Sequence, residues 1–274
     1  MKVSAVIPTI NEEKTIGEVI EGLKSLGHEV EVIVVDTNSR DRTREIAEEK
    51  GAKVISEPKR GYGVAYKTGL DNITGDIAVC LDGDGTYPTD VVGPLIQILQ
   101  MDEVDFISCD RITLRTAKNY TTLHFVGNSI LTKSIGMLFK VSLKDSQSGM
   151  WVFRADLYRQ MRNLSDGMSF SQDIKIEAIK LGKFIEIPIK YGVRITKPKL
   201  NTWRDGFTNL FYVFIKRVNN SRTHLQARQT FLKQTLGKVL VLLCRLQCWH
   251  GDPQEEIFQG STDRQRRRKE VHRP

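Results

Sequence analysis

The stretch IAVCLDGDGTYP, residues 77–88, decides the fold of this chain. Its five apolar residues from Ile77 to Leu81 predict a short buried strand, and two acids separated by one glycine follow at once. In open sheets of parallel strands, ligands gather at the carboxyl ends of the strands. Asp82 and Asp84 therefore stand where a ligand site is expected.

Three similar strands precede this stretch. Apolar runs at residues 3–8, 30–35 and 53–56 alternate with segments of helical spacing, and Asn11 is the expected N-cap of the first helix. Short links between strands and helices predict parallel strands with crossover helices, an α/β domain. The expected helices cover 11–26, 41–50, 61–72, 88–101, 122–139 and 172–181, and two later strands are expected at 104–109 and 184–192.

The composition predicts a globular protein with a basic tail. The chain has 274 residues, of which 40% are hydrophobic and 27% charged, and no apolar run predicts a transmembrane helix. Of the net charge of +8, +6 falls on residues 221–274, where eleven Lys and Arg stand against five Asp and Glu. We expect a globular domain over 1–220 and a basic, helical or disordered tail over 221–274. Such a tail can contact nucleic acid or an anionic membrane, or remain a solvated end. The four scattered cysteines indicate a reducing, cytoplasmic setting.

Asp82 and Asp84 are the candidate metal ligands. On a turn loosened by Gly83 and Gly85, two carboxylates one residue apart can face the same hard cation. Mg²⁺ or Mn²⁺ is commonly bound by few carboxylates together with diphosphate oxygens, so one of these ions and a diphosphate ligand are predicted. An isolated Asp-x-Asp is more often a solvated turn, but its position after the fourth strand favours the metal site.

Other polar segments are candidates for the same site. Asp36 ends the second strand, where an acid commonly accepts ribose hydroxyls or a base N–H, although it could instead cap the next helix. The basic loop 59–63 could contact a diphosphate, and the polar loop 145–149 could position sugar hydroxyls; either could equally be a plain turn. A basic cluster that suits phosphate, if it is not merely a solvated loop, comprises Arg194, Lys197, Lys199 and Arg204.

Together these motifs resemble the family 2 inverting glycosyltransferases of the GT-A fold. The motifs are PTINE at 8–12, the spaced residues Asp36, Ser39, Asp41 and Thr43, RGYGVA at 60–65, DGDGTYP at 82–88, DSQSG at 145–149 and the run from 194 to 200. The later motifs are similar to the dolichyl-phosphate mannosyltransferase group. The run 199–206 is similar to archaeal enzymes that glycosylate dolichyl phosphate for protein N-glycosylation. The resemblance covers about residues 3–218.

The resemblance implies an activity and its partners. The implied reaction is inverting transfer of a hexose from a GDP- or UDP-linked sugar to dolichyl or polyprenyl phosphate, with Mg²⁺ or Mn²⁺ as cofactor. The expected partners are the nucleotide-sugar, the polyprenyl phosphate and the cytoplasmic face of a membrane, on which the chain would be peripheral. No nucleic acid is expected as a partner.

Residue roles follow from position in these motifs. Contacts to the nucleotide-sugar are implied for Pro8, Thr9, Asn11, Glu12, Asp36, Asn38, Gly61, Asp82 and Gly83. Contacts to the acceptor are implied for Arg111, Asn128 and Gln147. Catalytic roles are implied for Asp84, Arg111, Asp173, Arg194 and Lys199.

Two positions depart from the family pattern. The mannosyltransferases have a glutamine as third metal ligand where this chain has Thr86, a weaker ligand that water would supplement. A second acceptor arginine expected just before Asn128 is absent, and His124 or Lys118 would compensate.

The acceptor decides whether a general base is needed. A phosphate monoester, with a second pKa of about 6, is largely ionised at neutral pH and hardly needs one. A sugar hydroxyl would need a base, and Asp173 is then the candidate, unless it is merely an acid at a helix N-terminus. The aromatic stripe on 203–218 and the apolar, basic stretch 229–246 could lie in a membrane interface, although the stripe could equally pack in the core.

Other classes of protein fit less well. A dinucleotide-binding oxidoreductase needs G-x-G-x-x-G in its first turn, where this chain reads PTINEEKT. An enzyme that synthesises sugar nucleotides would show a glycine-rich basic loop there. A nucleic-acid-binding module gains support only from the basic tail. A non-catalytic protein that binds nucleotide-sugars remains an open alternative.

Overall fold

The fold is known from a computed structural model, which describes residues 2–27, 29–101, 103–116 and 122–194 together with Asn209, 211–213 and Lys216. All of them belong to the first of two units of the chain, Met1–Leu232. The expected boundary near residue 220 and the tail 221–274 lie outside the described residues. So do the stretch 229–246, most of the stripe 203–218, and Lys118, Lys197, Lys199 and Arg204.

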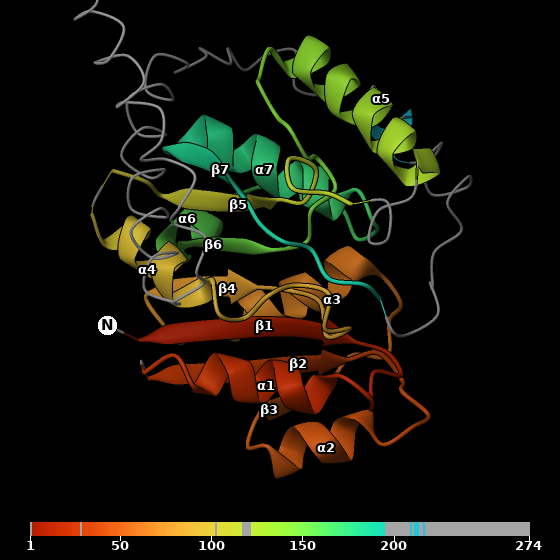
Figure 1. Ribbon diagram of the computed structural model, residues 1–274, viewed down its shortest axis with the longest axis vertical. Helices are drawn as coiled ribbons and strands as arrows, with labels where there is room; N and C mark the ends of the chain where they lie inside the picture. Colours follow the sequence, from red (N-terminus) through yellow and green to blue (C-terminus); the bar gives the residue numbers. More distant parts are fainter. Residues whose placement is uncertain are drawn as a thin grey trace, which may run out of the picture. The chain divides into compact units, whose positions relative to one another are not determined.

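Within the described ranges, seven strands form one mixed sheet (Figure 1). Their order is β3-β2-β1-β4-β6-β5-β7, and β6 is antiparallel to both of its neighbours while every other pair is parallel. The predicted α/β class with a mostly parallel sheet is confirmed. The strands are β1 Val3–Thr9, β2 Val30–Asp36, β3 Lys53–Ser56, β4 Ile77–Cys80, β5 Phe106–Asp110, β6 Trp151–Arg154 and β7 Phe184–Pro188.

Helices follow most strands and cover the sheet (Figure 1). The helical spacing of the sequence is explained by burial: α1 turns Ile16, Val19, Ile20 and Leu23 inward, which covers the apolar face of the strands. No helix in the described part of the chain is both long and apolar enough to span a membrane. The helices are α1 Ile16–Lys24, α2 Thr43–Glu49, α3 Tyr62–Leu70, α4 Val92–Gln100, α5 Thr122–Phe139, α6 Ala155–Gln160 and α7 Phe170–Leu181.

One local prediction was wrong, and two elements were missed. Asn11 is not the N-cap of the first helix, which begins only at Ile16. Asn11 instead adopts a left-handed conformation with φ 51°, and its side-chain oxygen accepts a hydrogen bond from the Arg40 backbone N–H at 2.7 Å. The strand β6 and the helix α6 were not predicted. β6 has only four residues, and its ladder partners lie in β4 and β5, far away in the sequence.

An aromatic core lies between the sheet and the helices α3, α6 and α7. Tyr66 of α3 stacks on Phe170 of α7, with ring centroids 5.6 Å apart and nearly parallel planes. Trp151 of β6 packs on Tyr66 at 5.1 Å and is fully buried. Burial of such large rings supplies much of the hydrophobic stabilisation of a domain this size. Because Tyr66 also reaches the acid stretch, this core forms the rigid support of the candidate site.

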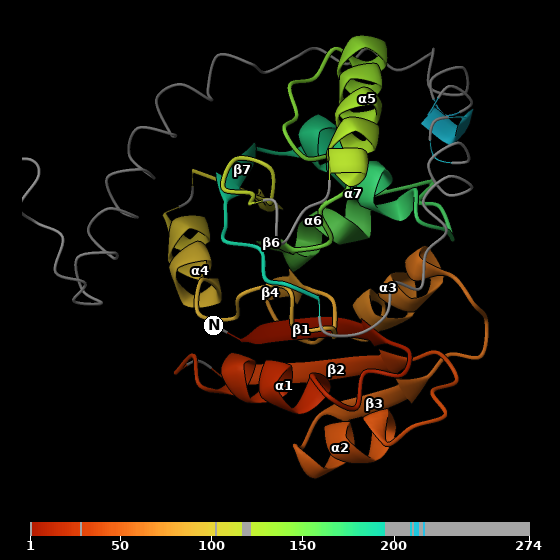
Figure 2. The ribbon, with the colours of Figure 1, turned by 45° about the vertical axis from the view of Figure 1, so that its right-hand side comes forward.

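A smaller apolar cluster joins α5 to α7. Ile135 and Phe139 of α5 pack with Ile176 of α7 and with Val213, and all four are almost fully buried. Figure 2 shows α5 beside α7. The opposite face of α5 exposes apolar side chains: Val126 is 47%, Ile130 54% and Met137 78% accessible.

Candidate active site

The acid stretch forms a tight loop after β4, which we call the carboxylate loop, residues 82–86. The Asp84 carboxylate is 2% exposed, and its Oδ1 accepts hydrogen bonds from the Thr86 backbone N–H at 3.1 Å and from the Thr86 hydroxyl at 2.6 Å. Its Oδ2 lies 2.6 Å from Nη2 of Arg194, an ion pair without the alignment of a hydrogen bond. Thr86 thus orients Asp84 through its hydroxyl proton.

Asp82 is held by hydroxyl groups. Its Oδ1 accepts hydrogen bonds from Tyr62 at 3.0 Å and from Tyr66 at 3.3 Å. Burial, together with the neighbouring Asp84 carboxylate, raises the pKa of Asp82 to about 7. Two acids this close together, of which Asp84 is paired with Arg194 and Asp82 with neutral hydroxyls, keep a net negative charge for a cation.

The carboxylate loop needs its glycines. A side chain at Gly83 would place its Cβ 2.9 Å from Cγ2 of Thr9, and the Gly83 carbonyl accepts a hydrogen bond from the Thr15 hydroxyl at 2.7 Å. Gly85 has φ 73°, a conformation that favours glycine. From the other side, Gly149 approaches so closely that a Cβ there would lie 2.3 Å from the Tyr62 hydroxyl and 3.3 Å from Oδ2 of Asp82.

The donor set fits a divalent cation that draws further ligands from a bound molecule. No group of three His, Cys, Asp or Glu that could hold a metal exists among the described residues. Oδ2 of Asp84 is buried and makes no hydrogen bond, and Asp82 is only half buried. Hard oxygen ligands of this kind suit Mg²⁺ or Mn²⁺.

The loops after β1 and β2 are joined next to the carboxylate loop. Asp36 is fully buried and accepts hydrogen bonds from the Thr9 hydroxyl at 3.2 Å and from the Ser39 backbone N–H at 3.1 Å. The Ser39 hydroxyl accepts from the Asn11 backbone N–H, and the Glu12 backbone N–H donates to the Thr43 hydroxyl. Asp36 does not cap α2, whose N-cap is Arg42. It ties the ends of two parallel strands together.

The remaining donor-side candidates follow the same loops. Pro8 pairs with Val35 in the parallel ladder between β1 and β2. Asn38 has φ 53°, and its amide donates to the Pro58 carbonyl at 3.2 Å. Gly61 precedes α3, and a Cβ there would lie 2.5 Å from the Asp166 carbonyl.

The basic loop 59–63 turns its lysine away from the carboxylates. Lys59 pairs with Asp166 at 2.6 Å, and Asp166 also pairs with Lys67 of α3. The residue of this loop that reaches the acids is Tyr62, whose hydroxyl donates to Asp82, and this contact was not predicted. A tyrosine at the first turn of a helix carries no local signal of such a contact.

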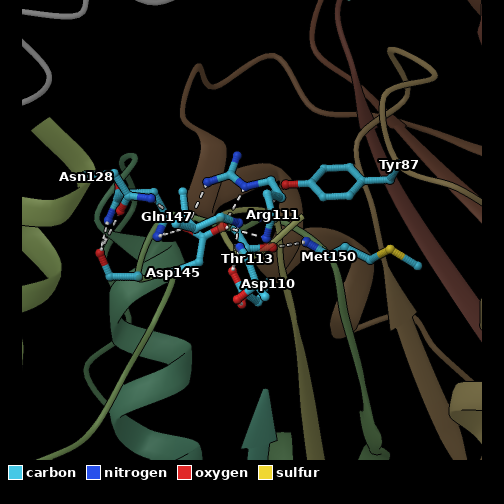
Figure 3. A network of polar contacts seen from close by, with 12 residues as sticks. Tyr87, Asp110, Arg111, Thr113, Asn128, Asp145, Gln147 and Met150 are labelled. Atoms are coloured by element: carbon cyan, nitrogen blue, oxygen red, sulfur yellow. Dashed lines mark hydrogen bonds and ion pairs between the residues drawn. The ribbon is translucent and has the colours of Figure 1, made fainter. Parts of the chain in front are cut away.

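A second cluster, which we call the arginine cluster, is built around Arg111 after β5 (Figure 3). Asp110 shapes the turn by accepting the backbone N–H groups of Ile112 at 2.7 Å and Thr113 at 3.2 Å. Arg111 forms a bidentate pair with Asp145, with Nε to Oδ2 at 2.7 Å and Nη2 to Oδ1 at 3.0 Å. Arg111 is a predicted acceptor contact, and Asp145 belongs to the polar loop 145–149, for which the sequence predicts either sugar contacts or a plain turn; the pairing of the two residues was not predicted.

Asp145 also brings together the other two predicted acceptor residues (Figure 3). Its Oδ1 accepts from the Asn128 amide at 2.8 Å and from the Gln147 backbone N–H at 3.1 Å. Burial alone would raise the pKa of Asp145, but the Arg111 guanidinium holds it well below its ordinary value. Arg111, Asn128 and Gln147 are thus held on one carboxylate.

The segment after β7, residues 189–194, runs from the arginine cluster to the carboxylate loop. The Arg111 guanidinium lies over the Tyr191 ring, with Cζ of Arg111 5.3 Å from the ring centroid. The Gly192 N–H donates to the Thr86 carbonyl at 2.7 Å, and a Cβ at Gly192 would lie 3.2 Å from that oxygen. Arg194, at the end of this segment, forms the ion pair with Asp84. The two clusters therefore belong to one site, whereas Lys199 lies outside the described residues.

Asp173 is engaged in a different way from a typical general base. It is fully buried, and its carboxylate accepts hydrogen bonds from Lys216 at 2.6 Å, from the Tyr212 hydroxyl at 2.7 Å and from the Ser165 backbone N–H at 2.8 Å. Burial raises the pKa of Asp173, although Lys216 opposes the shift. These contacts connect Tyr212 and Lys216 to α7.

The chain matches a known family over more than half its length. Residues 4–162 match glycosyl transferase family 2. The chain is 30% identical over 254 residues to the low-salt glycan biosynthesis hexosyltransferase Agl6 of Haloferax volcanii, which covers 90% of this chain but only 60% of Agl6. It is 31% identical over 205 residues to the dolichyl-phosphate hexose transferase of the same organism, covering 74% of this chain and 88% of that protein.

A solved structure shares the fold. Glucosyl-3-phosphoglycerate synthase from Mycobacterium tuberculosis, solved with Mn²⁺, UDP-glucose and phosphoglyceric acid, superposes with a TM-score of 0.62 at 23% identity, covering 80% of each chain. The family match, the strand order and the paired carboxylates at the end of β4 agree with one another. The chain belongs to glycosyl transferase family 2.

Proposed function

We propose that this chain transfers a hexose from a nucleoside-diphosphate sugar to a polyprenyl phosphate of the dolichyl type, with inversion at the anomeric carbon. One observation carries the proposal: the carboxylate loop and the arginine cluster are joined by residues 189–194 into a single site. A site for a cation and a site for a phosphate therefore lie together. The names of the two Haloferax volcanii relatives, a hexosyltransferase and a dolichyl-phosphate hexose transferase, support this assignment.

The carboxylate loop would serve the donor. Asp82 and Asp84 would hold Mg²⁺ or Mn²⁺, which when bound neutralises charge on the leaving diphosphate. The Thr86 hydroxyl keeps Asp84 oriented, and Tyr62 and Tyr66 keep Asp82 in place. The loops after β1 and β2, with Asp36 buried between them, would receive the nucleoside.

The arginine cluster would serve the acceptor. Arg111 is fixed by Asp145 before any ligand arrives, so a phosphate that binds there is oriented at little entropic cost. A phosphate monoester is largely ionised at neutral pH, so its oxygen can attack without a general base. The three hydrogen bonds on the buried Asp173 carboxylate also favour a phosphate acceptor over a sugar hydroxyl.

A transfer assay tests the proposal. The full chain is incubated with GDP- or UDP-linked hexoses, Mg²⁺ or Mn²⁺ and dolichyl phosphate in detergent, and the lipid product is identified by mass and anomeric configuration. We expect one donor to yield an inverted hexosyl phosphate lipid. Hydrolysis of the donor without transfer, or transfer only to sugar hydroxyls, would overturn the proposal.

We also propose that the chain contacts the cytoplasmic face of a membrane, where such an acceptor resides. The outer face of α5 exposes Val126, Ile130 and Met137 beside the exposed Lys133 and Lys140, a composition that suits an anionic lipid surface. Flotation with anionic liposomes, comparing the chain with a variant carrying serine at the three apolar positions, tests this. Equal flotation of the two proteins would remove α5 from the contact.

A further inference from the structure

A fully buried lysine lies behind the arginine cluster. Lys175 of α7 has no accessible surface, and its ammonium donates a hydrogen bond to the backbone carbonyl of Asp145. Lysine is almost never fully buried without a compensating partner, because removal of an ammonium group from water is costly. The complete burial of Lys175 is not explained by any of the proposed donor or acceptor contacts, in which Lys175 takes no part.

A buried acid holds the same peptide segment from the other side. Glu186 of β7 is 7% exposed and accepts the backbone N–H groups of Lys144 at 2.6 Å and Asp145 at 3.1 Å. Lys175 and Glu186 thus bind the two peptide groups that flank the Cα of Asp145. Burial lowers the pKa of Lys175 and raises that of Glu186. Each charge partly compensates the other.

The side chain of Asp145 completes the arrangement. Its carboxylate accepts hydrogen bonds from Arg111, from Asn128 and from the Gln147 backbone N–H. The position of the Arg111 guanidinium is therefore set by Asp145, and the position of Asp145 is set by Lys175 and Glu186. The cluster contains two cations and two anions, so it is balanced as a whole.

We infer that Lys175 is a positioning residue for the acceptor phosphate, which acts by fixing the Asp145 backbone and thereby the Arg111 guanidinium. The inference rests on the proposed function for the identity of the acceptor, but the contacts on which it depends are independent of the donor. Displacement of a binding group by about 1 Å can reduce a rate by about a hundredfold. Loss of Lys175 should therefore weaken acceptor use and spare the donor side.

The principal variant is Lys175→Met, which keeps the length of the side chain and removes its charge. We expect the KM for dolichyl phosphate to rise about tenfold or more, in line with a lost orienting contact, while binding of nucleoside diphosphate with Mn²⁺ stays within about twofold. Lys175→Arg, which retains a cation, should recover part of the acceptor affinity. Lys180→Met on the same helix, which removes the largely buried pair with Glu177, is the matched control and should leave both affinities unchanged.

A second variant separates positioning from charge balance. Lys175→Met leaves the cluster with one excess negative charge, whereas the double variant Lys175→Met with Glu186→Gln is balanced again. If Lys175 positions Asp145, the double variant keeps the raised acceptor KM relative to Glu186→Gln alone. If the double variant returns to the KM of Glu186→Gln, Lys175 serves only to balance charge and the inference is overturned.

Hydrogen exchange tests the inference without any turnover. The backbone amides of Asp145 and Gln147 are hydrogen-bonded within the cluster, so their segment should exchange about tenfold faster in Lys175→Met than in the parent chain. Unchanged exchange at this segment would overturn the positioning role. If the parent chain shows no transfer at all, the proposed function fails, and the exchange result still decides whether Lys175 holds the loop.

Discussion

The two halves of the site are built on different principles. On the donor side, around the ends of β1, β2 and β4, most contacts to the carboxylates come from hydroxyl and backbone groups; Asp82 contacts two tyrosine hydroxyls, and Asp36 contacts Thr9 and Ser39. The arginines that pair with Asp84 and Asp36 are partly exposed: the side chain of Arg194 is 32% accessible and that of Arg44 is 45% accessible. On the acceptor side, around β5, β7 and α7, buried charges are paired with buried charges, as in Arg111 with Asp145.

The difference indicates what each half is prepared to bind. Carboxylates held mainly by neutral groups and by partly exposed arginines retain negative charge for a cation, so the donor side is suited to a metal and its diphosphate. The acceptor side has already balanced its charges, which fixes the Arg111 guanidinium before the acceptor arrives. Binding of an anion to a fixed cation loses little conformational entropy.

The largest effect is expected when the charge on the donor side is removed. Asp84→Asn keeps the shape and can still accept the Thr86 hydrogen bonds, but it loses the negative charge that the proposed metal site depends on. We expect sugar transfer to fall on the order of a thousandfold, and Mn²⁺ binding in the presence of GDP or UDP to fall with it. Transfer rates and calorimetric titration with Mn²⁺ measure the two effects.

A matched control sharpens this prediction. Asp90→Asn removes an exposed carboxylate six residues further along the chain, and it should leave both transfer and Mn²⁺ binding unaltered. Full activity of Asp84→Asn would contradict the metal assignment and with it the proposed division between the two halves.

On the acceptor side, the largest effect is expected on stability. Asp145→Asn leaves the buried Arg111 without its counter-charge, so the free energy of unfolding should fall by about 3–5 kcal/mol. Denaturant titration measures it. Asp156→Asn, which breaks the exposed pair with Arg159, is the control and should cost at most about 1 kcal/mol. Equal small losses in both variants would contradict the view that buried pairs organise the acceptor side.

The contribution of Asp145 to the free energy of unfolding should also depend on pH. Because its pKa in the folded state lies below that in the unfolded chain, its stabilisation is complete above about pH 4 and is lost as the pH falls further. The difference in unfolding free energy between the parent chain and Asp145→Asn should therefore shrink between about pH 4 and pH 2. A difference that stayed constant through this range would show that the ionised carboxylate is not the source of the effect.

The same contrast explains how much of the site the sequence could predict. Asp82 and Asp84 follow a run of apolar residues directly, and the loops after β1 and β2 follow theirs, so parallel pairing alone brings them together. Asp145 lies in the polar loop 145–149, which the sequence already marks as a candidate, but nothing local points to the contact between Asp145 and Lys175. Their contact joins residues thirty positions apart, across an antiparallel strand that the periodicity did not reveal.

A smaller effect on metal binding is expected at Gly149, where the loop 145–149 lies against Tyr62 and Asp82. Gly149→Ala would place a Cβ 2.3 Å from the Tyr62 hydroxyl, so Tyr62 and Asp82 must shift. We expect affinity for Mn²⁺ with nucleoside diphosphate to fall about tenfold, equivalent to about 1.4 kcal/mol. Gly127→Ala, where a Cβ meets nothing within 4 Å, should instead stabilise α5 by up to about 1 kcal/mol. If Gly149→Ala binds Mn²⁺ and nucleoside diphosphate as tightly as the parent chain, the metal site does not depend on the observed positions of Tyr62 and Asp82.

The smallest effect on turnover is expected at Asp173. Its carboxylate already accepts hydrogen bonds from Lys216, Tyr212 and the Ser165 backbone N–H, so Asp173→Asn should lower kcat by less than about tenfold. The loss should appear mainly as a lower free energy of unfolding, because Lys216 is left buried with a neutral partner. Tyr212→Phe, which removes one of the three contacts and keeps the carboxylate, is the control.

A loss of kcat of about a hundredfold or more in Asp173→Asn, with unfolding unchanged and Tyr212→Phe fully active, would identify Asp173 as a general base. The acceptor would then be a sugar hydroxyl, and the preformed arginine cluster would need another role.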